Sequence, residues 1–165
     1  MTNPSYSTVT GIEQSGERTQ IVRRPGVISI VVYTATGAVE LAKVFGALAG
    51  RKVSIMVMQL GEGYANFVVD SKLREQARIA LEELGKEFRL SDDRTIISIR
   101  ASNMREASGI MYRIARALKR AKAKVDLIGD SYNSVSCLID DSTVEQTYQE
   151  LCAEFPQDGE CGEEE

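Results

Sequence analysis

The sequence makes one passage twice, and this repeat limits the folds that the chain can adopt. VFGALAGRKVSIMVMQL (Val44–Leu60) reads as the end of a helix, a turn and a strand, and IARALKRAKAKVDLIGDS (Ile114–Ser131) follows the same course. Ala47-Leu48 and Ala117-Leu118 correspond at an offset of 70 residues. Because 165 residues can bury one ordinary core or two small ones of about 70 residues each, the repeat predicts two like units.

The first half alternates between strand and helix patterns. The β-branched run GVISIVVY predicts a strand at 26–33, and the apolar spacing of AVELAKVFGALAG predicts a helix. KVSIMVMQL and GEGYANFVVD read as the two strands of a hairpin. SKLREQARIALEELG predicts a helix that Ser71 begins and Gly85 ends, and a short strand at Phe88–Leu90 completes β-α-β-β-α-β.

The second half repeats this order. It predicts a strand TIISIRA, a helix from about Gly109 to Ala121, strands KVDLIG and VSCLID, and a helix from Thr143 to about Glu154. The predicted fold class is α+β, with two ferredoxin-like βαββαβ units whose antiparallel sheets pair side by side. The expected organisation is a leader at 1–25 with a short strand at Ser7–Ile12, a first unit at 26–92, a second at 93–155, and a disordered acidic tail at 156–165.

Charge and hydropathy exclude several classes of protein. The last ten residues, PQDGECGEEE, hold five of the 24 acidic residues and no basic one, so the rest has 20 basic and 19 acidic residues. No apolar run approaches the roughly 20 residues that a membrane helix needs, and the N-terminus lacks the pattern of a signal peptide. We expect a cytoplasmic protein that binds no membrane.

The sequence also argues against a metal site, a cofactor or an enzyme. Histidine is absent, and Cys137, Cys152 and Cys161 form no CxxC pair. No glycine-rich phosphate loop follows a strand, and no cysteine has a partner base. Cys137 lies in the apolar run VSCLI and is predicted to be a core residue, as are Met56, Met58 and Met111.

The segment Met104–Asp140 resembles a known family. It shows in order a Met-Arg pair, a small residue before glycine, a helix that ends in Ala-Leu, and V-D-L-I. LAKVFGALA, the strand that ends at Gln59, and VTGI (Val9–Ile12) resemble the corresponding parts of the first half and the strand before it. The chain therefore resembles tandem ACT-domain proteins, in particular the C-terminal regulatory part, or small regulatory subunit, of aspartate kinase.

The resemblance implies a non-catalytic regulator of amino-acid biosynthesis. Such a protein binds an amino acid as allosteric effector and forms a homodimer, and a larger catalytic subunit is a possible partner. ACT domains commonly hold the effector between the first β-α loop of one unit and a strand of its neighbour, where helix amides can bind a carboxylate. The implied effector contacts are Thr34, Ala35, Thr36, Gly37, Ala38, Val39, Gln59, Met104, Arg105, Gly109, Asp130, Ser131 and Asn133.

Departures from the family pattern leave two alternatives open. The first loop reads Thr-Ala-Thr-Gly (34–37) where the family often has Asp-x-Pro-Gly, Leu60 follows Gln59 where asparagine is usual, and Ser131-Tyr132 stands for a common Ser-Glu pair. One alternative is an oligomerisation scaffold without a ligand. The other is an RNA-binding ferredoxin-like module. Such modules stack bases on aromatic residues of their strands, and the strands predicted for this chain carry few aromatic residues. The basic residues that would contact the phosphates of RNA are Arg113, Arg116, Lys119, Arg120, Lys122 and Lys124.

Overall fold

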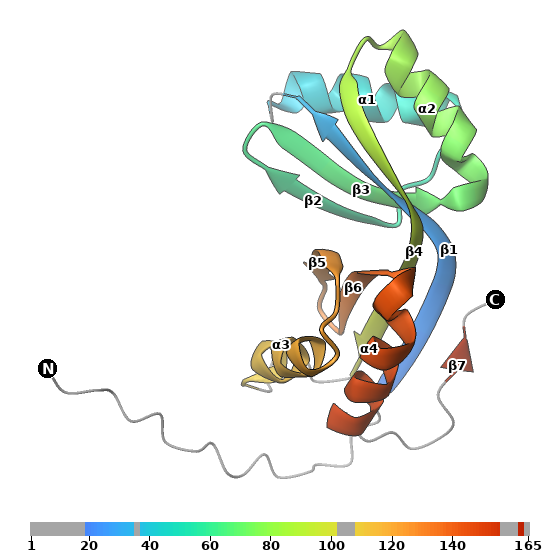
Figure 1. Cartoon of the computed structure of the whole chain (residues 1–165). Coiled ribbons are helices and arrows are strands. Elements are labelled where there is room, and N and C mark those ends of the chain that lie inside the picture. The colour runs from blue at the N-terminus through green and yellow to red at the C-terminus, as the bar shows by residue number, and fades with distance from the viewer. Residues whose placement is uncertain (1–18, 35–36, 102–107, 156–161, 164–165) are drawn as a thin grey trace, which may run out of the picture.

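The chain forms one continuous twisted sheet with helices packed on it (Figure 1). The structure is a computed structural model that describes residues 19–34, 37–101, 108–155 and 162–163. Six strands lie in the order β2-β3-β1-β4-β6-β5, and a short seventh pairs with β1. The elements are β1 (Gln20–Tyr33), α1 (Ala38–Gly50), β2 (Val57–Gly61), β3 (Tyr64–Asp70), the 3-10 helix η1 (Ser71–Leu73), α2 (Arg74–Glu83), β4 (Glu87–Arg100), α3 (Ile110–Arg120), β5 (Val125–Asp130), β6 (Ser134–Asp140), α4 (Asp141–Glu154) and β7 (Gly162–Glu163).

Strands β1 and β4 run through both units and join them. They pair antiparallel from Tyr33↔Glu87 at one end to Gln20↔Arg100 at the other. The late part of β1 and the early part of β4 form the first sheet with β2 and β3, and the remaining parts form the second sheet with β5 and β6. The expected α+β architecture of two ferredoxin-like units is confirmed, and the units share two strands.

This sharing changes two expectations from the sequence. The first strand begins at Gln20 and not at Gly26, because β1 passes through Pro25-Gly26 with shifts of register and does not end there. Residues 20–25, assigned to the leader, therefore belong to the sheet. The separate strands expected at Phe88–Leu90 and Thr95–Ala101 are parts of the single strand β4, which ends at Arg100.

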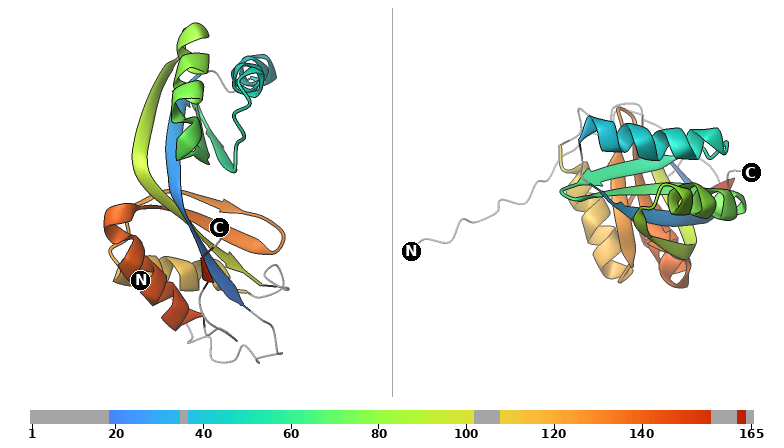
Figure 2. Two further views of the ribbon diagram at one scale, coloured as in Figure 1. Left: turned by 90° about the vertical axis from the view of Figure 1, so that its right-hand side faces the viewer. Right: turned by 90° about the horizontal axis from the view of Figure 1, so that it is seen from above.

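Each unit has its own apolar core beneath its helix pair. In the first unit the side chains of β4 that face the helices stand at even positions, such as Phe88 and Leu90. In the second unit they stand at odd positions, such as Ile97 and Ile99. The left view of Figure 2 accordingly shows the pair α1–α2 and the pair α3–α4 on opposite sides of the long β1–β4 ribbon. The positions of the apolar residues along β4 therefore determine which side of the strand each helix pair covers.

A third apolar cluster lies between the helix-free faces of the two units. We call it the inter-unit cluster; its buried members are Val27, Val68, Ile96, Leu127 and Leu138. Met56 and Val57 pack against it. Strand β5 comes close to β2 there, because a Cβ atom on Gly129 would lie 2.8 Å from Cγ1 of Val57. The first and second units therefore pack directly on each other as well as sharing strands.

An aspartate caps the first helical turn after the hairpin of each unit, η1 in the first unit and α4 in the second. The Asp70 carboxylate accepts a hydrogen bond from the Lys72 amide at 2.9 Å, so a 3-10 turn precedes α2 and the predicted serine cap is wrong. The Asp140 carboxylate accepts from the Ser142 amide at 3.0 Å, and α4 begins at Asp141, two residues before the predicted start. Both caps satisfy amides that helix ends leave without partners.

Burial confirms one sulfur-containing core residue and contradicts two. Cys137 is fully buried as predicted. Met58 and Met111 are 44% and 49% exposed, because β2 is an edge strand and Met111 lies on the outer face of α3. The predicted core positions of these two methionines are therefore wrong. Met56 is half-buried beside the inter-unit cluster.

Some expectations fall on residues outside the described ranges. These include the short strand at Ser7–Ile12, Cys161 and most of the acidic tail. Of that tail the structure describes Gly162–Glu163, which pair in parallel with Val22 and Arg23 of β1. Among the described helices none combines the length and the apolar composition that a bilayer crossing requires.

Candidate functional site

The end of β1, the start of α1 and the tip of the β2–β3 hairpin meet at one end of the first unit. The amide of Thr34 donates to the carbonyl of Gly63 at 3.0 Å. The Thr34 side chain is only 8% exposed and continues the alternation of Ile30 and Val32 toward the helix-covered face. Its Oγ1 atom has no hydrogen-bond partner in the described part of the chain. A buried hydroxyl is normally bonded, so this atom is available to donate or accept a further hydrogen bond.

Helix α1 starts beside Thr34 without a side-chain cap. Gly37 is the N-cap residue in an extended conformation, and its carbonyl accepts from the amides of Glu40 and Leu41 at 3.0 and 3.1 Å. The preceding amides, those of Ala38 and Val39, are the donors that a helix N-terminus offers to an anion. Val39 is also 70% exposed. This end of α1 is therefore suited to bind a carboxylate.

The acid nearest to this helix start is already paired. Glu40 contacts Lys43 at 2.6 Å and Lys86 at 2.5 Å. Hydrogen bonds from these two lysines lower the pKa of Glu40 to about 2. The carboxylate is therefore neutralised within the chain and would not hold the ammonium group of a ligand.

Gln59 lies on the face of the sheet that carries no helices. It pairs across the ladder with Asn66, whose Oδ1 accepts from Ser29 Oγ at 2.8 Å on that face. Its neighbours in β2 pair with residues of the helix-covered core, Met58 with Phe67 and Leu60 with Ala65. Within one chain, Gln59 and the buried Thr34 therefore lie on opposite faces of the sheet. A ligand that touches both has to reach over the edge at β2.

The second unit has an equivalent end. Gly109, with φ of +86°, is the N-cap residue of α3, and the amide of Ala101 donates to the carbonyl of Asn133 at 3.0 Å. Ser131 closes the β5–β6 turn through its amide to the carbonyl of Ser134 at 2.8 Å, and the two hydroxyls are 2.7 Å apart. Strand β5 ends at Asp130. The structure thus brings Asn133 of this turn to the end of β4, the strand that leads toward α3.

Four of the expected site residues cannot be placed. Ala35 and Thr36 in the first loop, and Met104 and Arg105 in the second, lie outside the described residues.

Seven large apolar side chains are exposed on the elements that form these two ends, with Tyr33 on the helix-free face of the sheet and Met58 and Leu60 on the helix-covered face. The first patch consists of Tyr33, Val39, Met58 and Leu60, and the second patch of Met111, Tyr112 and Tyr132. Among the described residues, these seven are the exposed large hydrophobic side chains, and only Val39 was among the site residues expected from the sequence. The sequence signal for them was position alone, since each lies at a strand end, a helix start or a turn.

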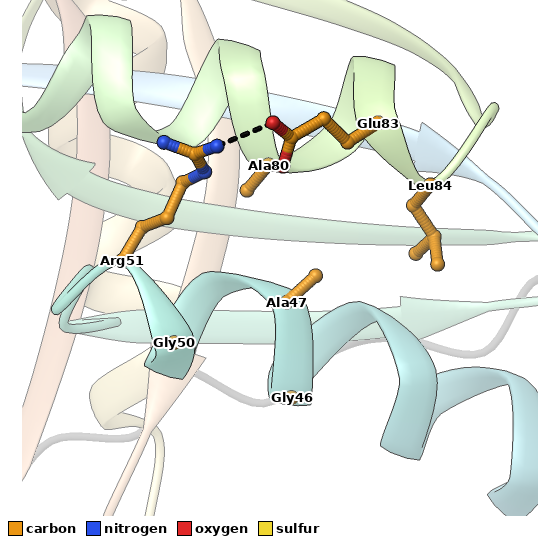
Figure 3. Close-up of a pocket in the computed structure, with 7 residues that line it drawn as sticks. All are labelled: Gly46, Ala47, Gly50, Arg51, Ala80, Glu83 and Leu84. Atoms are coloured by element: carbon orange, nitrogen blue, oxygen red, sulfur yellow. Dashed lines mark hydrogen bonds and ion pairs between the residues drawn. The ribbon is translucent and has the colours of Figure 1, made fainter.

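A groove between α1 and α2 lies away from the expected site (Figure 3). Its volume is about 450 Å³, and an ion pair of 2.5 Å between Arg51 and Glu83 lies at its rim. The residues that line it are Gly46, Ala47, Gly50, Arg51, Ala80, Glu83 and Leu84. None of the expected effector contacts is among them.

The basic residues of α3 are largely engaged by α4. Glu154, whose side chain is 6% exposed, contacts Arg113 at 3.2 Å, Arg116 at 2.5 Å and Arg120 at 2.9 Å. Arg120 also contacts Glu150 at 2.6 Å. These arginines join two helices, and two carboxylates offset much of their charge, which weakens the case for a phosphate-binding surface.

The described residues offer no group of three or more carboxylate or cysteine side chains that could hold a metal ion.

Comparison with known proteins defines the class. Residues 97–155, most of the second unit, match the sequence model of the ACT domain family. The first unit has the order β-α-β-β-α-β around its own core, whereas the second runs from β4 to α4 and takes its fourth strand from the early part of β1. A search of curated proteins by sequence gave no match.

Solved structures share the fold of the whole chain. The regulatory subunit of aspartate kinase from Thermus thermophilus, in its ligand-free form, aligns with a TM-score of 0.76 at 20% identity, over 84% of this chain and 98% of that one. A structure of aspartokinase alpha and beta subunits gives 0.76 at 23% identity, over 84% and 98%. E. coli aspartokinase III in complex with lysine and aspartate gives 0.67 at 16% identity, over 83% and 33%. The resemblance to the regulatory part of aspartate kinase is confirmed at the level of the fold.

Proposed function

We propose that this protein is a non-catalytic regulatory protein that binds a free amino acid as its effector, in the manner of an aspartate kinase regulatory subunit. The observation that carries the proposal is the buried, unpartnered hydroxyl of Thr34 beside the uncapped start of α1. The α-carboxylate of an amino acid accepts hydrogen bonds from the amides of Ala38 and Val39 and from this hydroxyl.

The ligand's side chain would meet exposed apolar side chains at this end. Met58 and Leu60 lie on the same side of the sheet as Thr34, and Val39 is exposed at the helix start. Glu40, the acid of the first turn of α1, is paired with two lysines. The proposal therefore favours an amino acid with an uncharged side chain over lysine or aspartate, the ligands of the E. coli aspartokinase III structure.

A homodimer is part of the proposal, because the first and second patches leave apolar surface in water. The first patch includes Met58 and Leu60 of the edge strand β2, and Tyr132 of the second patch follows the other edge strand, β5. Edge strands with apolar side chains pair readily with another chain. The relative with alpha and beta subunits supports a larger catalytic partner as a further binding partner.

Thermal unfolding of the purified protein with each of the twenty amino acids tests the proposal. A ligand at about 5 mM that binds only the folded state raises the melting temperature, since it stabilises by RT ln(1 + [L]/Kd). We expect a rise with one or a few uncharged amino acids that Thr34→Val reduces. Arg78→Gln is the matched control, because Arg78 pairs only within α2 and leaves the site untouched.

A second measurement separates the sensor from the scaffold. Sedimentation of the protein with and without the amino acids gives the oligomeric state. If the protein is a dimer and no amino acid raises its melting temperature, the proposed sensor is wrong and the oligomerisation scaffold is the better interpretation.

A further inference from the structure

The two units join where β1 and β4 both depart from regular strand geometry. We call this place the junction; it consists of Pro25-Gly26 in β1 and Asp92-Asp93 in β4. Gly26 has a φ of +72° and Asp93 a φ of +56°, a region that residues with a side chain rarely adopt. The pairing of β1 with β4 shifts register between Arg24 and Val27 and again before Ser29. Backbone of this kind persists only where its surroundings hold it.

Arg94 holds the β4 side of the junction. Its Nη1 donates to the carbonyl of Asp92 at 2.7 Å and to that of Asp93 at 3.2 Å. The Arg94 side chain is only 15% exposed. A guanidinium that donates to both carbonyls stabilises the left-handed conformation of Asp93.

The same guanidinium reaches the second unit. Its Nε donates to Oδ2 of Asp126 in β5 at 2.6 Å, and its Nη1 lies 3.0 Å from Oδ2 of Asp140 at the end of β6. Asp140 also caps α4 through the amide of Ser142. Arg94 therefore ties the junction to the strand and the helix start of the second unit.

A second arginine ties the junction to the first unit. Arg74, the first residue of α2, donates its Nε and Nη2 to the two carboxylate oxygens of Asp92 at 2.8 and 3.2 Å. Both side chains are nearly half exposed, at 43% and 46%. The contacts form one chain from α2 through Asp92 and Arg94 to the second unit.

We propose that Arg94 is the positioning residue that sets the angle between the two units. The inter-unit cluster also holds the units together, but apolar contact has no fixed direction, whereas a guanidinium fixes its partners in a plane. The role of Arg94 goes beyond the proposed function and does not depend on it. It means that the units can change their angle only by releasing the bonds of Arg94.

The distance between spin labels on the two units tests this inference. Labels at Gln76→Cys in α2 and Gln146→Cys in α4 occupy exposed positions of different units. The full chain carries Cys152→Ser and Cys161→Ser and keeps the buried Cys137. Dilution with unlabelled protein removes distances between chains. We expect one narrow distance distribution, and a broader or shifted one in Arg94→Gln.

Three further variants make the test decisive. Arg94→Lys keeps the charge but cannot bond two carbonyls and two carboxylates together, so we expect it to broaden the distribution as Arg94→Gln does. Asp126→Asn weakens one contact of Arg94, so we expect this variant to broaden the distance distribution less. It takes the place of Arg94→Gln if that variant fails to fold. Arg78→Gln, whose ion pairs stay within α2, is the control and leaves the distribution narrow.

Two outcomes would overturn the proposal. An unchanged distribution in a folded Arg94→Gln or Asp126→Asn protein means that the inter-unit cluster sets the angle. A narrow distribution in Arg94→Lys means that a positive charge suffices and that the geometry of the guanidinium has no such role.

Discussion

A Cβ atom added to Gly129 would lie 2.8 Å from Cγ1 of Val57. Gly129 belongs to β5 of the second unit and Val57 to β2 of the first. The absence of a side chain at residue 129 therefore allows two strands from different units to approach each other, beside the inter-unit cluster. This contact explains a glycine inside the strand VDLIGD that the sequence alone does not account for.

Replacing this glycine tests the contact. We expect Gly129→Ala to lower the free energy of unfolding by about 1 to 3 kcal/mol, since a methyl group has to displace Val57 from a packed position. Urea unfolding measures the change. Gly46→Ala is the control, because open space surrounds that position in α1, and alanine there raises stability by about 0.5 to 1 kcal/mol. Equal stability of Gly129→Ala and the parent protein would contradict a tight contact.

Glu154 supports a second prediction, because its buried carboxylate joins three arginines of α3 to the end of α4. Glu154→Gln is expected to lower the free energy of unfolding by about 1 to 3 kcal/mol, since it removes charged hydrogen-bond acceptors from a buried position. Glu75→Gln breaks an exposed ion pair within α2 and is expected to change the free energy of unfolding by less than about 1 kcal/mol. Similar losses in the two variants would mean that burial of Glu154 has no special effect.

The same residue gives a dependence on pH. Burial alone would raise the pKa of Glu154, but hydrogen bonds from Arg116, Arg120 and Arg113 outweigh it and hold the pKa below its ordinary value. A carboxyl with a lowered pKa stabilises the fold above its unfolded pKa of about 4.3, and this contribution is lost as the pH falls through the folded value. The difference in stability between the parent protein and Glu154→Gln is therefore expected to shrink between pH 6 and pH 3, measured by urea unfolding at each pH. A constant difference would contradict the lowered pKa.

Glu40 should remain ionised in unusually acidic solution. Its pKa lies at about 2 because Lys43 and Lys86 donate hydrogen bonds to it. Carbon-detected NMR titration of the side-chain carboxyl measures this value directly. Lys86→Met is expected to raise the pKa toward the ordinary value, and Lys72→Met, at a lysine in another helix, leaves it unchanged. A titration of Glu40 near pH 4 in the parent protein would show that the two contacts do not persist in solution.

The two described cysteines should differ in reactivity. Burial raises the pKa of the Cys137 thiol to about 12, so little thiolate exists at pH 8. Cys152 is half-buried in α4. With iodoacetamide at pH 8, mass spectrometry is expected to find Cys152 modified much faster than Cys137, and both modified alike in urea. Equal rates in the folded protein would contradict the burial of Cys137.

The order of elements follows from the sequence, because local patterns determine it. Helix α1 and the turn of the β2–β3 hairpin appear where apolar spacing and Gly61–Gly63 predict them, but β2 begins at Val57, five residues later than the predicted strand KVSIMVMQL. The length of β1 and β4 could not be predicted in the same way. A Pro-Gly pair usually ends a strand. Strand β1 nevertheless continues through Pro25-Gly26, because Gln20–Arg24 pair with residues of β4 that are distant in the chain.

The candidate site is only partly readable from the sequence for a similar reason. The Thr-Ala-Thr-Gly loop identifies a helix start, yet the burial of Thr34 and the missing partner of its hydroxyl depend on the closed fold. Met58 has the alternation of a core residue, and its exposure follows from the place of β2 at the sheet edge. Strand order arises from tertiary pairing, which a periodic pattern does not encode.

The shared strand β1 has a consequence for the order in which the chain folds during synthesis. All strands of the first sheet lie within residues 27–91, so this unit can close while the ribosome still makes the second. Gln20–Arg24 leave the ribosome first but gain their partner in β4 only after the first unit has been made. The late part of β1 is by then fixed in the first sheet, and it presents Gln20–Arg24 as a ready edge. The second unit would therefore fold last, onto a template from the beginning of the chain.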